Sequence, residues 1–275
     1  MIRLFASDLD GTLLNAHHQF DERIVDGIRR LLAEGAAFAI ATGRGNKQCA
    51  IPEIESDVYK ICMNGALILD KNDAVLAMSC VPKPVLARLL DELPEYAFDF
   101  VTPDKTYTRY SKETYFTRKV DTSADALWKE RFMRDFLPRI QFAATKQQIL
   151  DADVCKINLR VDPGMDTRHL DAFLAAHEKE IANAPSGSGL YELTAHGVNK
   201  GQAVLRLGNR LGIDPDEIAV YGDGGNDLEM LGLFEHAYAP ANASETAKQK
   251  AKDVIGPSDQ YSVITHMQKT LGIES

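Results

Sequence analysis

The sequence predicts an α/β protein in which one α+β module is inserted into a domain built on a parallel sheet. Short apolar runs alternate with longer amphipathic ones near both ends of the chain, which is typical of strand–helix units. Between about Pro82 and Gly189 this texture changes, and Pro- and Gly-rich stretches mark both boundaries. The outer segments, 1–82 and 189–275, are therefore expected to form one domain around an inserted domain, 83–188.

Composition and charge exclude several classes of protein. The 275 residues are 45% hydrophobic and 26% charged, which excludes a disordered or collagen-like chain. The 31 Lys and Arg against 40 Asp and Glu give a net charge of −9. That balance argues against nucleic-acid and anionic-membrane partners, whose binding depends on Lys and Arg. No apolar run approaches the ~20 residues of a spanning helix, and the four cysteines form no C-x-x-C pair, so a cytoplasmic protein with reduced thiols is expected. No feature specifies an oligomeric state.

The N-terminal strands and helix are predicted from the spacing of apolar residues and from the helix-capping and turn residues between them. Ile2–Ser7 is expected as a first strand, and Asp21 is placed as the N-cap of a helix that stops near Gly35. Ala36–Ala41 is a near-continuous apolar run, as expected of a strand covered on both faces. A third strand is expected over Tyr59–Met63, and a hairpin over Leu67–Leu69 and Val75–Met78.

The C-terminal segment repeats this rhythm. Lys200–Leu211 carries one apolar helical stripe and ends at Gly212, a residue that commonly terminates helices. Ile218–Tyr221 is expected as a strand that enters a glycine-rich turn, followed by a helix through Leu228 and Leu231. Ala237–Ala239 is expected as the last strand.

The inserted domain is expected to mix strands and helices. Its aromatic-rich stretches predict strands, and two longer amphipathic stretches predict helices. The expected strands are Tyr96–Val101, Tyr107–Tyr110 and Cys155–Val161, and the expected helices are Ser123–Phe136 and Asp166–Ile181.

Two acids follow the first strand directly. Asp8 and Asp10 stand in D-x-D-G-T, at the carboxyl end of a parallel strand, where α/β sheets place their active sites. A turn at Gly11 is expected to bring the side chain of Asp10 round to that of Asp8. A solvated acidic turn is the alternative, since Asp and Gly are common turn residues.

Three further motifs occur at the ends of strands or the starts of helices. Thr42-Gly43-Arg44 offers a hydroxyl and a flexible backbone amide to a phosphate oxygen, although an ordinary turn would fit as well. Asn199-Lys200-Gly201 opens the later helix, and its lysine is either a point charge for a phosphate or solvated. Gly222-Asp223-Gly224-Gly225-Asn226-Asp227 combines small residues with two acids, which suits a hard cation, or else a glycine turn before a capped helix.

The order D-x-D-G-T, T-G-R, N-K-G and G-D-G-x-N-D is hard to attribute to turns alone. It resembles the haloacid dehalogenase (HAD) superfamily, and within it the Cof-type phosphatases of subfamily IIB. That resemblance implies a Rossmann-like core and an inserted α+β cap of the C2B type between the second and third motifs. The chain departs from the family pattern at Gly225, and at Pro240 and Ala241, where Met and Gly are usual. These positions lie beside the expected site rather than on its reacting groups.

The resemblance implies a Mg²⁺-dependent hydrolysis of small phosphomonoesters. It makes Asp8 the nucleophile that forms an aspartyl phosphate, and Asp10 the residue that protonates the leaving alkoxide. Mg²⁺ would be held by Asp8 and Asp223, by the main-chain carbonyl of Asp10 and, through a water, by Asp227. The expected phosphate-binding groups are Thr42, Gly43, Lys200 and Asn226.

The inserted cap is expected to select a small phosphorylated metabolite. Arg44, Tyr107 and Arg109 are candidate substrate contacts, although an aromatic strand residue more often packs in a core and Arg44 can equally pair with surface acids. Sugar phosphates, a nucleotide, pyridoxal phosphate and a flavin precursor all suit this pattern. Two other functions stay open: a phosphosugar mutase, which would retain the phosphate, and a non-catalytic regulator that binds a phospholigand.

Overall fold

The computed structural model divides the chain into two compact units. It describes residues 1–49, 51, 54–119, 132–162 and 164–273. The first unit comprises Met1–Met78, Ala184–Gly187 and Gly197–Ser275, and the second comprises Ser79–Asn183 and Ser188–His196. The second unit is thus an insertion whose last strand returns after a short excursion of the chain through the first unit. The fold is the α/β class that the sequence predicts.

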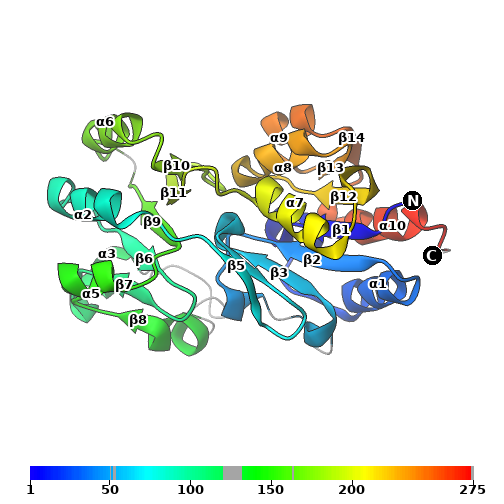
Figure 1. The fold of residues 1–275 in the computed structure, drawn as a ribbon, viewed down its shortest axis with the longest axis horizontal. Helices are drawn as coiled ribbons and strands as arrows, with labels where there is room; N and C mark the ends of the chain where they lie inside the picture. Colours follow the sequence, from blue (N-terminus) through cyan, green and yellow to red (C-terminus); the bar gives the residue numbers. More distant parts are fainter. Residues whose placement is uncertain (50, 52–53, 120–131, 163, 274–275) are drawn as a thin grey trace. The chain divides into compact units, whose positions relative to one another are not determined.

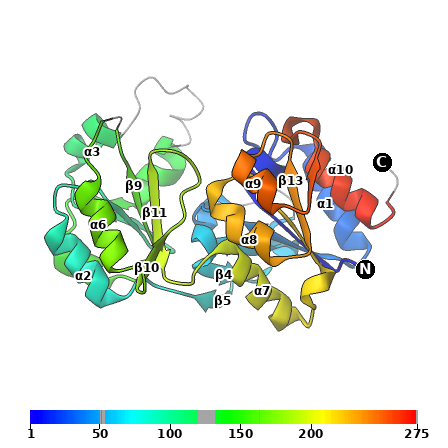
Figure 2. The same cartoon turned by 90° about the horizontal axis from the view of Figure 1, so that it is seen from above.

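The first unit contains an eight-stranded sheet between two layers of helices (Figures 1 and 2). Its strand order is β14-β13-β12-β1-β2-β3-β4-β5, parallel from β14 to β3 and antiparallel beyond. The strands are β1 (Leu4–Ser7), β2 (Ala37–Ala41), β3 (Tyr59–Cys62), β4 (Leu67–Leu69), β5 (Val75–Met78), β12 (Ile218–Tyr221), β13 (His236–Pro240) and β14 (Asp253–Ile255). The helices are α1 (Glu22–Ala33), α7 (Lys200–Leu211), α8 (Leu228–Leu233), α9 (Glu245–Lys250) and α10 (Ser262–Thr270).

Hydrophobic packing on the sheet follows the two-residue alternation of its strands. Leu4 and Ala6 of β1 pack with the apolar stripe of α7 and with α8 and α9 in one buried cluster. On the other side of the sheet α1 and α10 pack against each other. Because β1 lies at the centre of the parallel sheet, between β12 and β2, the carboxyl ends of these three strands meet at one edge. This is the edge at which the predicted motifs lie.

Local signals set the ends of several elements as predicted. Asp21 caps α1, since its side chain accepts the backbone N–H of Ile24 at 3.1 Å. Helix α7 ends at Gly212, which adopts the left-handed conformation with φ of 66°. The hairpin of β4 and β5 has the predicted bounds. The strand predicted over Ala237–Ala239 is confirmed as part of β13, but it is not the last strand, because β14 follows and pairs with it.

The second unit contains a six-stranded mixed sheet in the order β10-β11-β9-β6-β7-β8. Helices α2, α5 and α6 cover one face of it through a shared apolar cluster. The strands are β6 (Asp99–Val101), β7 (Thr106–Thr108), β8 (Ile140–Gln141), β9 (Lys156–Arg160), β10 (Ile181–Asn183) and β11 (Leu190–Ala195). The helices are α2 (Lys83–Glu92), α3 (Lys112–Lys119), α5 (Lys146–Asp151) and α6 (Arg168–Ala176).

Several predictions for this unit need correction. The strand expected over Tyr96–Val101 is only Asp99–Val101, and the helix expected over Asp166–Ile181 ends at Ala176, because Ile181 already belongs to β10. Residues 190–195, which the sequence assigned to the outer domain, form β11 and pair with β9 and β10. The boundary therefore lies near residue 197 rather than 189. Most of the helix expected over Ser123–Phe136 lies outside the described residues.

Candidate active site

The loop after β1 carries both acids of the first motif. The backbone N–H of Asp8 donates to the carbonyl of Tyr221 at 2.9 Å, so Asp8 stands at the junction of β1 and β12. Gly11 then turns the chain with φ of +80°, and a Cβ at this position would lie 2.5 Å from Asp223 Oδ2. Thr12 follows inside the core and donates from Oγ1 to Asp223 Oδ1 at 2.6 Å. The turn therefore joins the first acidic motif to the last one.

A buried lysine lies between two of the carboxylates. Lys200 opens α7 behind its N-cap Asn199, which accepts the N–H of Gln202 at 2.8 Å. Its Nζ donates to Asp8 Oδ1 at 2.6 Å and to Asp227 Oδ1 at 2.7 Å, and its side chain is 0% exposed. A lysine buried this completely needs such partners, because an unpaired ammonium would lose its hydration without compensation. Burial opposes the charge of Lys200, but the two carboxylates outweigh it and raise its pKa.

The second oxygen of Asp227 is held by the backbone of its own loop. Oδ2 accepts the N–H groups of Asp223 at 3.0 Å and of Gly224 at 2.9 Å. Three donors on one buried carboxylate fix its orientation. The next residue of the motif, Gly225, also fits the packing here, because a Cβ would lie 2.4 Å from the carbonyl oxygen of Pro185. This contact gives a physical reason for the departure from the family pattern at Gly225.

Three acids approach closely enough to hold one cation. Carboxylate oxygens of Asp8, Asp223 and Asp227 all lie within 4.8 Å of one another. Burial raises the pKa of Asp8 above its usual range, against the opposing charge of Lys200, and the two neighbouring acids raise it further. Burial and the charge of Asp227 likewise raise the pKa of Asp223 to about 6, although the Thr12 hydrogen bond opposes the rise. Oxygen donors whose negative charges repel one another in a buried site fit a hard divalent cation.

Asp10 points to a different set of partners. Arg44 holds its carboxylate with two donors, Nε to Oδ2 at 2.7 Å and a close contact from Nη2 to Oδ1. His18 Nδ1 lies 3.2 Å from Oδ1. Burial favours the neutral form of Asp10, but the hydrogen bonds and charge of Arg44, with a smaller contribution from His18, lower its pKa. Asp10 thus lies in the same loop as Asp8, but its side chain contacts Arg44 and His18 rather than Lys200.

The loop after β2 carries the second motif. Thr42 is buried, and its hydroxyl oxygen accepts the backbone N–H of Arg44 at 3.2 Å, so its hydroxyl hydrogen can point to an oxyanion. Gly43 is half-buried between them. Asn226 comes from the last motif and donates from Nδ2 to Asn64 Oδ1 at 3.0 Å. The structure therefore brings Asp8, Lys200, Asp223 and Asp227 into one group and Asp10 with Arg44 into another.

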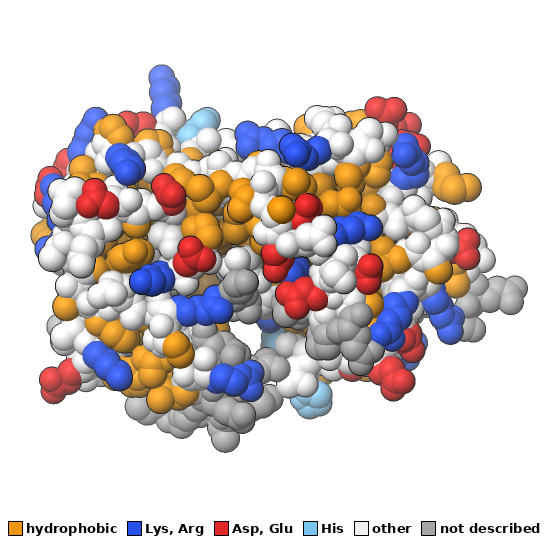
Figure 3. All heavy atoms as spheres, turned by 60° about the horizontal axis from the view of Figure 1, so that its bottom comes forward, with side chains coloured by type: hydrophobic (Ala, Val, Ile, Leu, Met, Phe, Trp, Pro, Cys, Tyr) orange, Lys and Arg blue, Asp and Glu red, His pale blue; other side chains and the backbone are white. Residues whose placement is uncertain are grey.

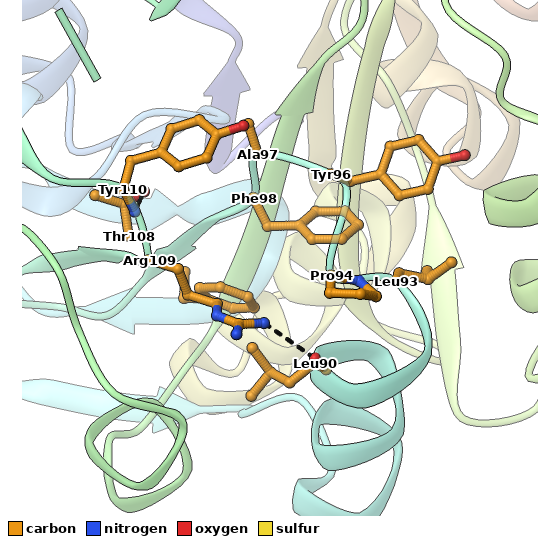
Figure 4. A pocket seen from close by; sticks show the side chains of 10 residues that line it. Leu90, Leu93, Pro94, Tyr96, Ala97, Phe98, Thr108, Arg109 and Tyr110 are labelled. Atoms are coloured by element: carbon orange, nitrogen blue, oxygen red, sulfur yellow. Dashed lines mark hydrogen bonds between the residues drawn. The ribbon is translucent and has the colours of Figure 1, made fainter. Parts of the chain in front are cut away.

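The two candidates from the inserted domain make contacts inside the second unit. Arg109 lines a small cavity of about 20 Å³ between the end of α2 and β6–β7, and its Nη1 donates to the carbonyl of Leu90 at 3.2 Å (Figure 4). That carbonyl lies in the last turn of α2, where carbonyl groups have no hydrogen-bond donor within the helix, so Arg109 supplies the donor. Tyr107 packs against the hydrophobic core of the unit. These contacts favour a packing role, and substrate contact stays a prediction for both residues.

Three residues with contacts to the site were missed by the sequence reasoning. The sequence motifs assign no role to Thr12, His18 or Asn64. Thr12 and Asn64 contact partners far along the chain, Asp223 and Asn226, whereas His18 contacts Asp10 within the same segment. Only Thr12 had a local signal, its place in D-x-D-G-T.

On the face drawn in Figure 3, Lys and Arg side chains are interspersed with Asp and Glu among the described residues. Within the described ranges no helix combines the length and apolar character needed to cross a membrane.

Comparisons with known proteins place this site in a family. The family model for haloacid dehalogenase-like hydrolases matches residues 5–267. The 5-amino-6-(5-phospho-D-ribitylamino)uracil phosphatase YbjI of Escherichia coli is 24% identical over 100% of this chain and 98% of its own.

Two solved structures share the fold over nearly the whole chain. A haloacid dehalogenase-like hydrolase from Bacillus subtilis superimposes with a TM-score of 0.81 at 25% identity, covering 97% of this chain and 99% of its own. The HAD subclass IIB sugar phosphatase BT4131 gives 0.78 at 20% identity, covering 99% and 100%. The match of the family model over most of the chain, together with the four motifs at one sheet edge, shows that this protein is an enzyme of the haloacid dehalogenase-like hydrolase family.

Proposed function

We propose that this hydrolase is a Mg²⁺-dependent phosphatase that releases phosphate from small phosphorylated metabolites through an aspartyl phosphate on Asp8. The observation that carries the proposal is the buried group in which Lys200 contacts both Asp8 and Asp227 beside Asp223. A protein that only bound phosphate would gain nothing from three carboxylates facing its anionic ligand, because each pair of like charges at 4 Å costs about 4 kcal/mol at an effective dielectric constant of 20. The names of the relatives, two of them phosphatases, agree with this reaction.

The metal site would use Asp8 and Asp223 through their side chains and Asp10 through its main-chain carbonyl. The carboxylate of Asp227 is fixed by Lys200 and two backbone amides, so it is suited to hold a metal-bound water in a constant orientation. When bound, Mg²⁺ would supply the positive charge that offsets the repulsion between the carboxylate nucleophile and an anionic phosphate. All the donors are oxygens, which is the ligand type that Mg²⁺ prefers.

Residues of the site would carry out the nucleophilic attack, the phosphate binding and the proton transfers. Asp8 attacks phosphorus from the end of β1, and Lys200 stabilises negative charge on the carboxylate and the incoming phosphate. The hydroxyl of Thr42, the amide of Gly43 and the side chain of Asn226 surround the equatorial oxygens. Asp10 protonates the leaving alkoxide and then takes a proton from the hydrolytic water, which requires Arg44 to release its carboxylate, because that pairing lowers the pKa of Asp10.

Substrate choice would belong to the second unit and to Arg44. The names of the relatives point to two substrate classes, a ribityl phosphate and sugar phosphates. Both are polyhydroxylated phosphomonoesters, so we propose that the substrate of this protein belongs to the same class. We also propose that the protein acts in the cytoplasm. Arg44, Tyr107 and Arg109 remain the candidate contacts.

A phosphate-release assay tests the function. The protein is offered sugar phosphates, a ribityl phosphate, nucleotides and pyridoxal phosphate with Mg²⁺ or with excess EDTA. Phosphate release in Mg²⁺ alone, abolished in Asp8→Asn, is expected. Full activity in EDTA would contradict the metal dependence, and an isomerised sugar phosphate without free phosphate would indicate a mutase.

A further inference from the structure

A turn with unusual backbone geometry follows β3. Met63, Asn64 and Gly65 all have positive φ, at 52°, 57° and 98°. Residues other than glycine disfavour this left-handed region of backbone conformation. The turn is fixed by its neighbours, because the N–H of Asn64 donates to the carbonyl of Thr42 at 3.0 Å and the turn packs against α7. It therefore joins the loop of Thr42 to the helix that begins with Lys200.

The side chain of Asn64 is almost completely buried within this turn. Asn64 is 1% exposed, and its Oδ1 accepts the hydrogen bond from Asn226 Nδ2 at 3.0 Å. Its own Nδ2 is buried and has no hydrogen-bond partner among the described residues. Buried amide donors are nearly always paired, because an unpaired one has lost its hydrogen bonds to water. This donor is held in a strained turn beside Asn226, a proposed phosphate-binding residue. Its lack of a protein partner indicates that an acceptor atom of a bound ligand takes that place.

We propose that Asn64 Nδ2 donates a hydrogen bond to a non-bridging oxygen of the substrate's phosphoryl group. This inference rests on the proposed function, since it adds a phosphate-binding residue to the same site. Asn64 would then act in two ways: its oxygen orients Asn226, and its nitrogen binds the tetrahedral oxyanion. The ligand chemistry is that of phosphate, and orthovanadate is its probe.

A double-mutant cycle separates the two actions. Asn64→Gly removes the amide and suits the left-handed backbone, and Asn226→Ala removes the partner. The dissociation constant of orthovanadate is measured by calorimetry in Mg²⁺ for the wild type, both single variants and the double variant. We expect Asn64→Gly to weaken vanadate binding about tenfold or more, both alone and in the Asn226→Ala background. No change in the Asn226→Ala background would show that Asn64 acts only through Asn226 and would overturn the proposal.

The controls separate this inference from the proposed function. Ala143→Gly also places glycine at a left-handed position, with φ of 49°, but in the second unit, and it should leave vanadate affinity unchanged. Urea unfolding reports whether each variant is folded, and Asn64→Ser replaces Asn64→Gly in the cycle if the latter is not. Vanadate binding needs no turnover, so a wild type without phosphatase activity would refute the function while the cycle still reports on Asn64. A wild type that binds no vanadate would refute the inference directly.

Discussion

The ammonium of Lys200 donates a 2.6 Å hydrogen bond to Asp8, a residue 192 positions earlier in the sequence, and neither side chain is appreciably exposed. Asp227 accepts from the same ammonium at 2.7 Å. One cation thus compensates two carboxylates in a buried site, so the folding of the site and its electrostatics depend on the same three groups.

Replacing Lys200 should cost both stability and activity. Lys200→Met leaves Asp8 and Asp227 buried without their cation, and losing one partner of a buried pair typically costs about 3–5 kcal/mol. We expect a drop of that size in the free energy of unfolding, measured with urea, together with loss of phosphate release. Lys248→Met is the matched control, because Lys248 pairs with Glu245 on the surface and should change stability by less than about 0.5 kcal/mol. Equal effects of the two substitutions would contradict the buried pair.

The close approach of Gly11 to Asp223 is open to a paired test. Gly11→Ala and Gly35→Ala both place a side chain at positive φ, 80° and 82°, so both incur the left-handed strain of about 1–2 kcal/mol. Only Gly11→Ala also forces a Cβ against the Asp223 carboxylate, since Gly35 has no atom within 4 Å of that position. We expect Gly11→Ala to be more destabilising by about 1–3 kcal/mol in urea unfolding, and to lose activity. Indistinguishable unfolding curves would argue against this packing.

The proton-transfer role of Asp10 predicts a dependence on the leaving group. Alkoxides leave poorly without a proton, whereas phenolates leave readily, so Asp10→Asn should slow alkyl phosphates about 10²–10⁴-fold and aryl phosphates much less. The measurement is kcat for both ester types in Mg²⁺. Asp26→Asn, on the exposed face of α1 where Asp26 pairs with Arg29, serves as the control. Equal slowing of the two esters would remove Asp10 from this role.

Stability should fall in mild acid through His266. This residue packs beside Tyr238 and shares a 3.0 Å hydrogen bond with the buried Tyr221, and burial lowers its pKa despite the opposing charge of Asp253. The unfolded chain therefore takes up a proton at this residue at higher pH than the folded protein does. As pH falls below about 6.5, the contribution of His266 to the free energy of unfolding should therefore decrease, while the raised pKa values of Asp8 and Asp223 act in the opposite direction.

The His266→Gln variant isolates this contribution. Between pH 7 and pH 5 the free energy of unfolding of this variant, measured with urea at each pH, should shift in favour of the variant relative to the wild type. His17→Gln, at an exposed loop position, is the control and should keep the wild-type slope. A wild-type slope in His266→Gln would assign the acid sensitivity to other groups.

Much of the fold of the first unit could be predicted because its signals are local. The Asp21 cap and the Gly212 terminus each act within one turn of their helices. Strand β11 was missed because Glu192, which looks like a surface residue in the sequence, is buried against Lys156 of β9. A charge compensated by a distant partner interrupts the apolar pattern on which strand prediction depends. The strand β14 is too short, and too exposed at Asp253 and Val254, to give a pattern of its own.

In the candidate site, too, local motifs could be predicted and long-range contacts could not. The motifs indicated which loops carry the chemistry, since parallel strands present their carboxyl ends at one edge. They did not indicate that Arg44 would pair with Asp10, or that Asn64 would contact Asn226 across 162 residues. Contacts of this kind depend on the register between strands and on the path of the loops, which no local pattern encodes.

The central position of β1 has a consequence for biosynthesis. Its neighbour β12 is made late, so a ribosome that has polymerised only the first 217 residues has already produced Asp8 and Lys200 but neither Asp223 nor Asp227. The nascent chain cannot assemble the proposed cation site, whatever else has already folded. Hydrolytic capacity should therefore arise abruptly, only after β12 has been synthesised and has docked beside β1.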